Sequence, residues 1–365
     1  MATQVSARLD PAIFRLPTER IREGYYSDAY FVHTKRLLEA ENHHPRVTMQ
    51  VFQKRQSLLG GIDEAIAVLK TCSGHEDPDG VWLPGWDQLE VRALYEGDPI
   101  APHETVMTIE GDYSLFAHLE TVYLGCLARR SLIMRNVKEV VDAAQGKPIF
   151  YFPARHDHWL VQTGDGWAAH VAGAIGVSTD AQASWWGGRG IGTVPHSLIA
   201  AYGGDTVTAA VKFSERFADE MNITVLVDFD NDSVKTALQV AAALGPEKLW
   251  GVRLDTSEQL VDRSLHDEMG GFRPTGVNPR LVEKVRSALD AAGFSDLRIV
   301  ASGGFTAERI GQFEAAGVPV DAYGVGSSLI RGENDFTADV VLVDGRPGGK
   351  VGRSYSPNSR LERVE

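Results

Sequence analysis

The chain has 365 residues, 43% of them hydrophobic and 23% charged, which predicts two domains at about 150 residues each and excludes a disordered chain. Its net charge of −13 excludes the broad positive surface that a general nucleic-acid or anionic-membrane binder needs. A small anionic substrate is compatible with this charge, because salt screens charges beyond roughly 8 Å and a few arginines inside a cleft then decide the local field.

The first 145 residues have the mixed pattern of a small α+β domain. Apolar residues recur at helical spacing in three segments, and two alternating segments between them are typical of strands in an antiparallel sheet. The predicted helices are 18–41, 61–70 and 114–144, and the predicted strands are 88–95 and 105–109. We therefore predict an N-terminal α+β domain over residues 1–145.

After Gly146, short apolar segments alternate with helical segments. The predicted strands are 149–152, 191–194, 223–227, 249–254, 297–301 and 320–325, and the clearest helices are 233–244, 279–292 and 307–316. The last two helices run into Gly293 and Gly317, which predicts their C-terminal ends there. Alternating strands and helices imply a parallel sheet, and we assign it to a domain over 146–335.

Polar or glycine-rich clusters follow four of these strands. They are Asp228-Phe229-Asp230, Arg253-Leu254-Asp255, Ser302-Gly303-Gly304 and Gly324-Val325-Gly326-Ser327-Ser328. Functional residues after many different strands favour a barrel, whereas an open sheet concentrates its chemistry at one switch point. The predicted fold class is α/β: an irregular TIM-like barrel with an N-terminal α+β sandwich domain, to which the C-terminal segment 336–365 returns.

The last two clusters match the phosphate site common in barrels. Glycine lets backbone N–H groups approach phosphate oxygens, and the start of the next helix adds a favourable dipole. The residues concerned are Ser302, Gly303, Gly304, Gly324, Gly326 and Ser327. The alternative is that these glycines only shape tight turns.

Two other pairs could bind an anionic ring or sugar. Arg253 and Asp255 alternate with Leu254, so both side chains can point to the barrel mouth. The arginine would suit a carboxylate or phosphate and the aspartate a ribose hydroxyl or an amide, although a structural ion pair is the alternative. Phe152 and Arg155 could hold a flat anionic ring, although such pairs are also common on surfaces.

His196 lies in the segment 192–199, where Pro195 predicts a helix start and Thr193 could supply a capping hydroxyl. The positive end of the helix dipole would then favour a neutral imidazole, a competent nucleophile or base. A capping or packing role is the alternative. No histidine pair has helical metal-ligand spacing, so we expect no zinc site, and the sequence names no protein metal ligand.

The string Gly-Thr-Val-Pro-His-Ser at 192–197 resembles the signature of nicotinate phosphoribosyltransferases, members of the type II phosphoribosyltransferases. Other matching segments, in chain order, are 27–30 (Ser-Asp-Ala-Tyr), 119–121 (Leu-Glu-Thr), 152–155 (Phe-x-x-Arg), 178–180 (Ser-Thr-Asp), 252–255 (Val-Arg-Leu-Asp), 301–304 (Ala-Ser-Gly-Gly) and 324–327 (Gly-Val-Gly-Ser). The resemblance covers about residues 20–330. The loop between Arg155 and Thr179 is closer to archaeal-type members, although the four-cysteine knuckle that some of them carry is absent here.

The resemblance implies a reaction between nicotinate and 5-phosphoribosyl 1-pyrophosphate that gives nicotinate mononucleotide and pyrophosphate, in NAD salvage. Magnesium would accompany the diphosphate, and ATP would be a co-substrate that phosphorylates His196. Family members form dimers with shared sites, so a homodimer or higher homo-oligomer is expected.

The resemblance also implies roles for the matching residues. Tyr30, reaching the partner's site, and Phe152 would sandwich the pyridine ring. Arg155 and Arg253 would face its carboxylate or the diphosphate, and Asp255 the ribose. The remaining substrate-binding positions are Thr179, Ser302, Gly303, Gly304, Gly324, Gly326 and Ser327, of which Gly303, Gly304, Gly326 and Ser327 would cradle the 5′-phosphate.

Several alternatives stay open. Nicotinamide could be the substrate, with Asp180 opposite its amide, or quinolinate, whose two carboxylates would want a denser basic pocket. A phosphosugar aldolase or isomerase fits poorly, because the strand-end clusters contain no lysine. A non-catalytic ligand-binding relative is the third class.

The cellular environment is the last expectation. Cys72 and Cys126 are too few for a disulfide framework and match no metal-binding spacing. No apolar segment reaches the roughly 18 residues of a membrane helix, and residues 1–17 lack a secretory signal pattern. We expect a cytoplasmic protein without membrane or nucleic-acid partners.

Overall fold

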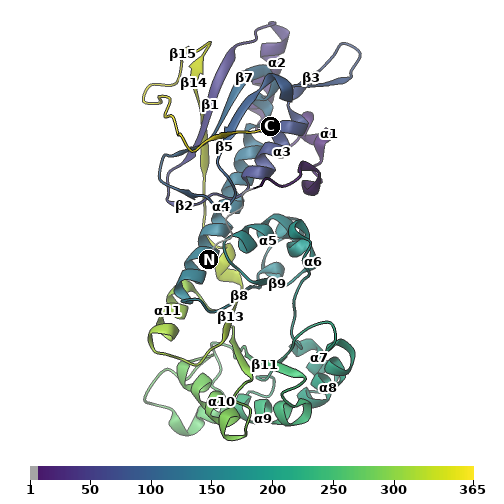
Figure 1. The fold of residues 1–365 in the computed structure, drawn as a ribbon, viewed down its shortest axis with the longest axis vertical. Coiled ribbons are helices and arrows are strands. Elements are labelled where there is room, and N and C mark those ends of the chain that lie inside the picture. Colours follow the sequence, from purple (N-terminus) through teal and green to yellow (C-terminus); the bar gives the residue numbers. More distant parts are fainter. Residues whose placement is uncertain (1–6) are drawn as a thin grey trace. The chain divides into compact units, whose positions relative to one another are not determined.

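The computed structural model describes residues 7–365. The chain divides into two compact units, which we call the first and the second unit (Figure 1). The first unit contains the described residues up to Arg135 together with Gly332–Glu365, and the second contains Asn136–Arg331. The predicted fold class is confirmed: a curled parallel sheet forms one unit and an antiparallel sheet the other.

The first unit is built on a six-stranded antiparallel sheet of order β15-β14-β1-β7-β5-β16. Its strands are β1 (Arg46–Gln53), β5 (Glu90–Ala93), β7 (Thr105–Asp112), β14 (Phe336–Val343), β15 (Arg346–Pro347) and β16 (Glu362–Arg363). Two short pairs, β2 (Ser57–Leu58) with β6 (Pro99–Ile100) and β3 (Gly74–Glu76) with β4 (Trp82–Pro84), complete it. The C-terminal segment thus returns to the N-terminal sheet, where β14 pairs with β1.

Helices cover this sheet and supply the core of the first unit. They are α1 (Thr18–Arg22), α2 (Ala29–Ala40), α3 (Ile62–Cys72) and the part of the long α4 (Glu120–Ala143) that extends to Arg135. Ile62, Ala65 and Leu69 of helix α3 pack in one hydrophobic core with strand residues such as Met49 and Ile109. All five residues are buried. Their spacing of three or four residues is the reason that this segment forms an amphipathic helix.

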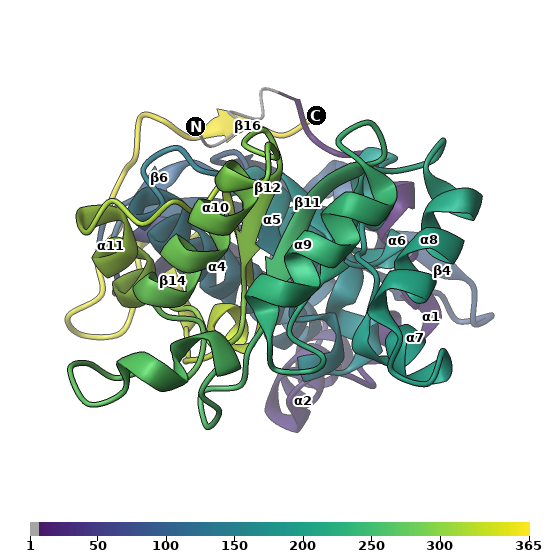
Figure 2. The same ribbon diagram turned by 90° about the horizontal axis from the view of Figure 1, so that it is seen from below.

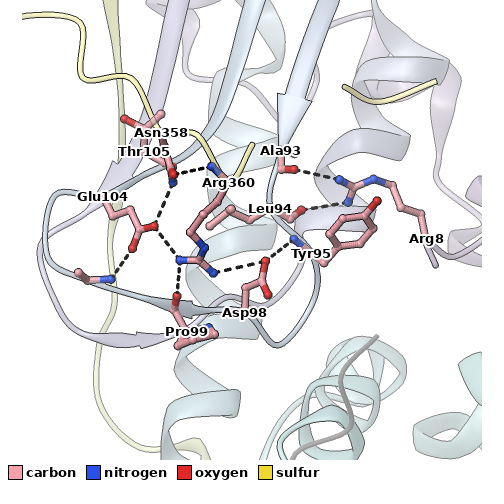
Figure 3. A network of polar contacts seen from close by, with 11 residues as sticks. Arg8, Ala93, Leu94, Tyr95, Asp98, Pro99, Glu104, Thr105, Asn358 and Arg360 are labelled. Atoms are coloured by element: carbon pink, nitrogen blue, oxygen red, sulfur yellow. Dashed lines mark hydrogen bonds and ion pairs between the residues drawn. The ribbon is translucent and has the colours of Figure 1, made fainter. Parts of the chain in front are cut away.

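Polar contacts fasten both ends of the described chain to the segment 93–105 of the first unit (Figure 3). The Arg8 guanidinium donates to the carbonyl oxygens of Ala93 and Leu94 at 3.2 and 3.1 Å. The Arg360 guanidinium donates to the Pro99 carbonyl at 2.9 Å and pairs with Glu104 at 2.7 Å. These contacts explain how terminal segments with few apolar residues hold their place.

The second unit contains a parallel sheet of order β10-β11-β12-β13-β8-β9. Its strands are β8 (Ile149–Tyr151), β9 (Gly176–Val177), β10 (Ile223–Leu226), β11 (Leu249–Leu254), β12 (Arg298–Ala301) and β13 (Ala322–Val325). Its helices are α5 (Gln162–Val171), α6 (Asp180–Ala183), α7 (His196–Ala201), α8 (Thr206–Phe217), α9 (Ser233–Leu244), α10 (Pro279–Ala291) and α11 (Ala307–Ala315). Figure 2 shows α9 lying across β11. All strands run the same way, so their carboxyl ends meet at one edge of the sheet.

Side-chain caps mark the starts of three helices in the second unit. Asp232, Asn278 and Thr306 accept a hydrogen bond from the backbone N–H three residues later, at the starts of α9, α10 and α11. The expected helix ends at Gly293 and Gly317 are confirmed, since both glycines take positive φ directly after α10 and α11. The caps fix where each loop stops at the carboxyl edge.

The predicted strand at 191–194 is wrong. The Ile191 N–H donates to the Val177 carbonyl at 2.7 Å, and the Val194 N–H donates to the Thr224 carbonyl at 2.8 Å. The segment therefore spans from β9 to β10 with one hydrogen bond to each side, and only Val194 forms an isolated parallel bridge, with Val225. Strand β9 itself was not predicted, because two residues give no pattern.

Candidate active site

A cavity of about 870 Å³ opens at the carboxyl edge of the parallel sheet and is lined entirely by residues of the second unit. The structure brings together there all predicted site residues except Tyr30. Those lining it are Phe152, Arg155, Thr179, His196, Arg253, Asp255, Ser302, Gly303, Gly304, Gly324, Gly326 and Ser327. They come from the loops after five different strands, as a barrel site does.

Arg253, Ser302 and Asp255 form one hydrogen-bonded group at the ends of β11 and β12. The Arg253 Nε–H donates to the Ser302 hydroxyl oxygen at 2.8 Å. The Ser302 hydroxyl in turn donates to Asp255 Oδ1 at 2.7 Å. Arg253 and Asp255 also make an ion pair at 3.5 Å. The ion pair considered as the alternative is therefore present, and both of its side chains also line the cavity, beside the buried Ser302.

The Phe152 ring lies beside this group and presents an aromatic face. The Arg253 guanidinium carbon is 5.2 Å from its centroid, and Phe150 stacks at 5.8 Å with an interplanar angle of 9°. A Cβ at Gly324 would lie 2.8 Å from a Phe152 ring carbon. Gly324, which the sequence argument placed in a phosphate loop, therefore makes room for the ring.

His196 is held by Asp228, which follows β10. His196 Nε2 and Asp228 Oδ1 are 3.1 Å apart, and the carboxylate is almost fully buried. This hydrogen bond raises the pKa of His196 above its ordinary value, although partial burial opposes the shift. The Asp228 carboxylate thus acts on the pKa of His196 in the direction opposite to the one expected from the start of the six-residue helix α7.

Thr193 does not cap α7 as predicted. The capping position is Pro195, which makes no side-chain capping bond, and the Thr193 hydroxyl accepts from the Arg253 guanidinium at 3.3 Å. The loop before His196 is thereby tied to the arginine of β11. Thr193 is a cavity residue that the sequence argument assigned to the wrong contact.

The loop after β12 has the backbone that an anion site needs. Gly303 and Gly304 both take left-handed conformations, with φ of 86° and 72°. Successive residues of this kind turn neighbouring N–H groups toward one concavity. Gly326 and Ser327 begin the turn after β13 on the same cavity wall.

Sequence reasoning missed several cavity residues. His156 and Arg331 line it together with Arg155, and burial and these two arginines lower the pKa of His156. Glu258 lines the cavity as well, close to Gly304. His156 could have been predicted as a cavity residue because it is adjacent to Arg155 in the sequence. Arg331 does not directly follow a strand, so nothing in the sequence indicated its place in the cavity.

Thr179 and Asp180 differ in their placement. Thr179 caps α6, donates to the Gln162 side chain at 2.9 Å and lines the cavity. Asp180, the residue considered opposite an amide, is exposed and accepts from the Gly190 N–H at 2.8 Å. It is not among the cavity residues, which weakens the nicotinamide alternative.

Tyr30 belongs to α2 of the first unit and is 60% exposed. Its hydroxyl lies 3.5 Å from Asp28, whose carboxylate accepts from the Thr121 hydroxyl at 2.9 Å. The ring is thus presented outward from a fixed helix start.

Two features are not found in residues 7–365, a cluster of metal-ligating side chains and a membrane-spanning helix. Within residues 7–365, no group of three or more His, Cys, Asp or Glu side chains is arranged to hold a metal ion. None of the helices in that range is long and apolar enough to cross a membrane.

The chain is similar to proteins of pyridine nucleotide metabolism. Residues 28–131 match the family described as quinolinate phosphoribosyl transferase, N-terminal domain. The chain is 29% identical over 284 residues to nicotinate phosphoribosyltransferase pncB1 of Mycobacterium tuberculosis, covering 75% of this chain and 58% of that protein. It therefore spans less than two thirds of the length of this curated relative.

Solved structures extend the similarity. The crystal structure of nicotinate-nucleotide pyrophosphorylase from Pyrococcus furiosus superimposes with a TM-score of 0.78 at 30% identity, covering 99% of this chain and 86% of the other. Human nicotinic acid phosphoribosyltransferase superimposes with a TM-score of 0.66 at 16% identity, covering 91% and 77%, and this likeness shows the fold alone.

Proposed function

Because the chain belongs to the type II phosphoribosyltransferase family, we propose that it joins nicotinate to 5-phosphoribosyl 1-pyrophosphate, giving nicotinate mononucleotide and pyrophosphate in NAD salvage. The observation that carries this proposal is the composition of one cavity. An aromatic ring beside an arginine lies at one place in it, and a left-handed Gly-Gly loop lies at another.

The ring site is suited to a flat carboxylate. Phe152 offers an aromatic ring for stacking, and the Arg253 guanidinium, 5.2 Å from its centroid, has N–H donors still available for a carboxylate. Ser302 and Asp255 hold the guanidinium in place, so little conformational freedom is lost on binding. The pyridine nitrogen would thereby be oriented toward the sugar carbon that it attacks.

Displacement of pyrophosphate needs positioning and charge neutralisation more than a protein acid. Negative charge accumulates on the departing diphosphate while the sugar becomes cation-like, and preorganised donors stabilise such charge. Arg155 and Arg331 supply positive charge at the cavity wall, and the Gly303–Gly304 loop supplies backbone donors. Asp255 would face the ribose.

Magnesium fits the acidic side of the cavity. Asp255 and Glu258 line it, and carboxylate oxygens together with diphosphate oxygens are the ligands that this ion prefers. Bound there, magnesium would neutralise part of the diphosphate charge.

ATP is proposed as a co-substrate whose phosphoryl group is accepted by His196. The His196 side chain is partly exposed and lines the cavity, and its Nε2 atom is held by Asp228. His196→Ala should then abolish stimulation by ATP and leave a slow basal rate. A parent protein that ATP never stimulates would remove this part of the proposal.

Quinolinate is the second candidate substrate, since two arginines near His156 line the cavity. Arg155 and Arg331 together could meet two carboxylates rather than one. The test is an assay of the purified protein with 5-phosphoribosyl 1-pyrophosphate, magnesium and each of nicotinate, quinolinate and nicotinamide in parallel. Mononucleotide formed fastest from nicotinate supports the proposal, and no product from any pyridine contradicts it.

A homodimer with shared sites is proposed from the exposed position of Tyr30. If Tyr30 completes the ring site of a partner subunit, mixing Tyr30→Ala and Arg253→Ala proteins restores activity in one site per dimer. Mixtures that stay as inactive as either variant would indicate self-contained subunits.

A further inference from the structure

The Gly303–Gly304 loop is held from outside the cavity by Arg309 of helix α11. One guanidinium nitrogen donates to the carbonyl oxygens of Gly303 at 3.1 Å and Gly304 at 3.4 Å. The other terminal nitrogen donates to the Val277 carbonyl at 2.5 Å. Arg309 itself does not line the cavity, so it binds the loop on the side away from the cavity.

The packing of Arg309 fixes its position. Its guanidinium carbon lies 4.5 Å from the centroid of the Phe305 ring, which is 2% exposed. Phe305 in turn packs edge-on against Phe313 at 5.0 Å. The Phe305 carbonyl accepts from the Ser328 hydroxyl at 2.8 Å, which links this loop to the turn after β13.

Three consecutive carbonyls are therefore occupied by side chains. In a trans peptide the N–H points opposite to the C=O, so binding the carbonyls of residues 303, 304 and 305 orients the N–H groups of residues 304, 305 and 306. None of these three N–H groups donates to another of residues 7–365. Gly304, Phe305 and Thr306 all line the cavity, where an anion can satisfy them.

We propose that Arg309 is a positioning residue for the phosphate of the ribose substrate. It touches no ligand but, by binding the Gly303 and Gly304 carbonyls, sets the backbone donors that do. This inference rests on the proposed function for the identity of the anion, a sugar 5′-phosphate. Lysine cannot replace it fully, because a single ammonium lacks the planar fork that spans the separate carbonyls.

The matched control is Arg286 of helix α10. Its guanidinium also binds two backbone carbonyls, those of Leu297 at 2.6 Å and Phe294 at 2.8 Å, but in a turn that does not line the cavity. Arg286→Met therefore reproduces the loss of a carbonyl-binding arginine without touching the phosphate loop.

The experiment compares the parent with Arg309→Met, Arg309→Lys and Arg286→Met. It measures the dissociation constant of ribose 5-phosphate by calorimetry, which needs no turnover, and the KM of each substrate. For Arg309→Met we expect at least a tenfold rise in the ribose 5-phosphate constant and in the KM for 5-phosphoribosyl 1-pyrophosphate, with the nicotinate KM within twofold. For Arg309→Lys we expect a dissociation constant and a KM between those of the parent and of Arg309→Met. For Arg286→Met we expect the values of the parent.

Unchanged ribose 5-phosphate binding in Arg309→Lys and in any folded Arg309→Met would overturn the inference. So would equal losses in the Arg309 and Arg286 variants, or a parent that does not bind ribose 5-phosphate. A parent that binds it in an Arg309-dependent way but forms no mononucleotide would instead contradict the proposed function and support the phosphate site.

Discussion

His196 Nε2 lies 3.1 Å from Asp228 Oδ1, although His196 begins α7 and Asp228 lies in the loop after β10. The carboxylate stabilises the protonated imidazole, so the pKa of His196 is raised. A group with a raised folded-state pKa contributes stability that is complete below its unfolded-state pKa and is lost as pH rises through the folded one.

Asp228→Asn should therefore destabilise the protein more at pH 5.5 than at pH 8.5. The variant removes the negative partner, which also returns the pKa of His196 toward its ordinary value. Urea denaturation at the two pH values measures the first effect and NMR titration of the His196 ring the second. Equal destabilisation at both pH values, with an unchanged titration, would mean that the pair is not charge-coupled.

Ser302→Ala should weaken catalysis without unfolding the protein. The serine hydroxyl accepts from Arg253 and donates to Asp255, and a hydrogen bond to a charged group is worth about 1.5–3 kcal/mol. We expect kcat/KM to fall about 10- to 150-fold. Ser214→Ala, which alters a buried serine outside the cavity, is the control and should retain parent kinetics.

Gly324→Ala should displace the Phe152 ring. The new Cβ would lie 2.8 Å from a ring carbon and 3.3 Å from Ser302 Cβ, and overpacking of this kind costs about 1–3 kcal/mol. The expected result is a higher KM for the pyridine and a lower melting temperature. Gly311→Ala is the control, since its Cβ meets nothing within 4 Å in α11 and alanine favours a helix by about 0.5–1 kcal/mol. A Gly324→Ala protein with parent KM would show that the ring does not bind the pyridine.

Glu96 should make the protein less stable as pH rises. Burial, with the nearby Asp63 charge as a second cause, raises the pKa of Glu96 to about 8, while the N–H groups of Gly61 and Asp63 donate to its carboxyl. Between its ordinary value and about pH 8 the folded state binds more protons than the unfolded chain, so the free energy of unfolding decreases with pH.

Glu96→Gln should flatten this dependence between pH 5 and pH 8, because the amide does not titrate. Urea denaturation at pH 5, 6.5 and 8 gives the slope for both proteins. Parallel slopes in the parent and the variant would show that another group is responsible.

The local patterns of the chain predicted the parallel sheet well. Strands β10 to β13 are short apolar segments followed by polar or glycine clusters, and their carboxyl ends must meet once the strands run parallel. The antiparallel strand β1 was missed, because Thr48, Gln50 and Gln53 interrupt its apolar pattern and are nevertheless buried. Gln50 has a partner far away in the sequence, since its side-chain oxygen accepts from the Ser356 N–H at 2.9 Å.

The candidate site shows the same division. Residue type and position at a strand end were enough to predict Phe152, Arg253 and Gly303 as site residues. The partner of His196 and the carbonyl contacts of Arg309 could be found only in the structure. Long-range pairs of this kind leave no periodicity in the sequence, which is why the sequence predicted neither the contact of Thr193 with Arg253 nor the contact of His196 with Asp228.

The measurement that tests the central claim most directly is nicotinate mononucleotide formation by the parent and by Arg253→Met, with Arg298→Met as an exposed-arginine control. Mass spectrometry follows the product from nicotinate, 5-phosphoribosyl 1-pyrophosphate and magnesium. We predict steady product formation by the parent and the control, and a loss of at least tenfold in kcat/KM for Arg253→Met. No product from the parent, or full activity in Arg253→Met, would contradict the account.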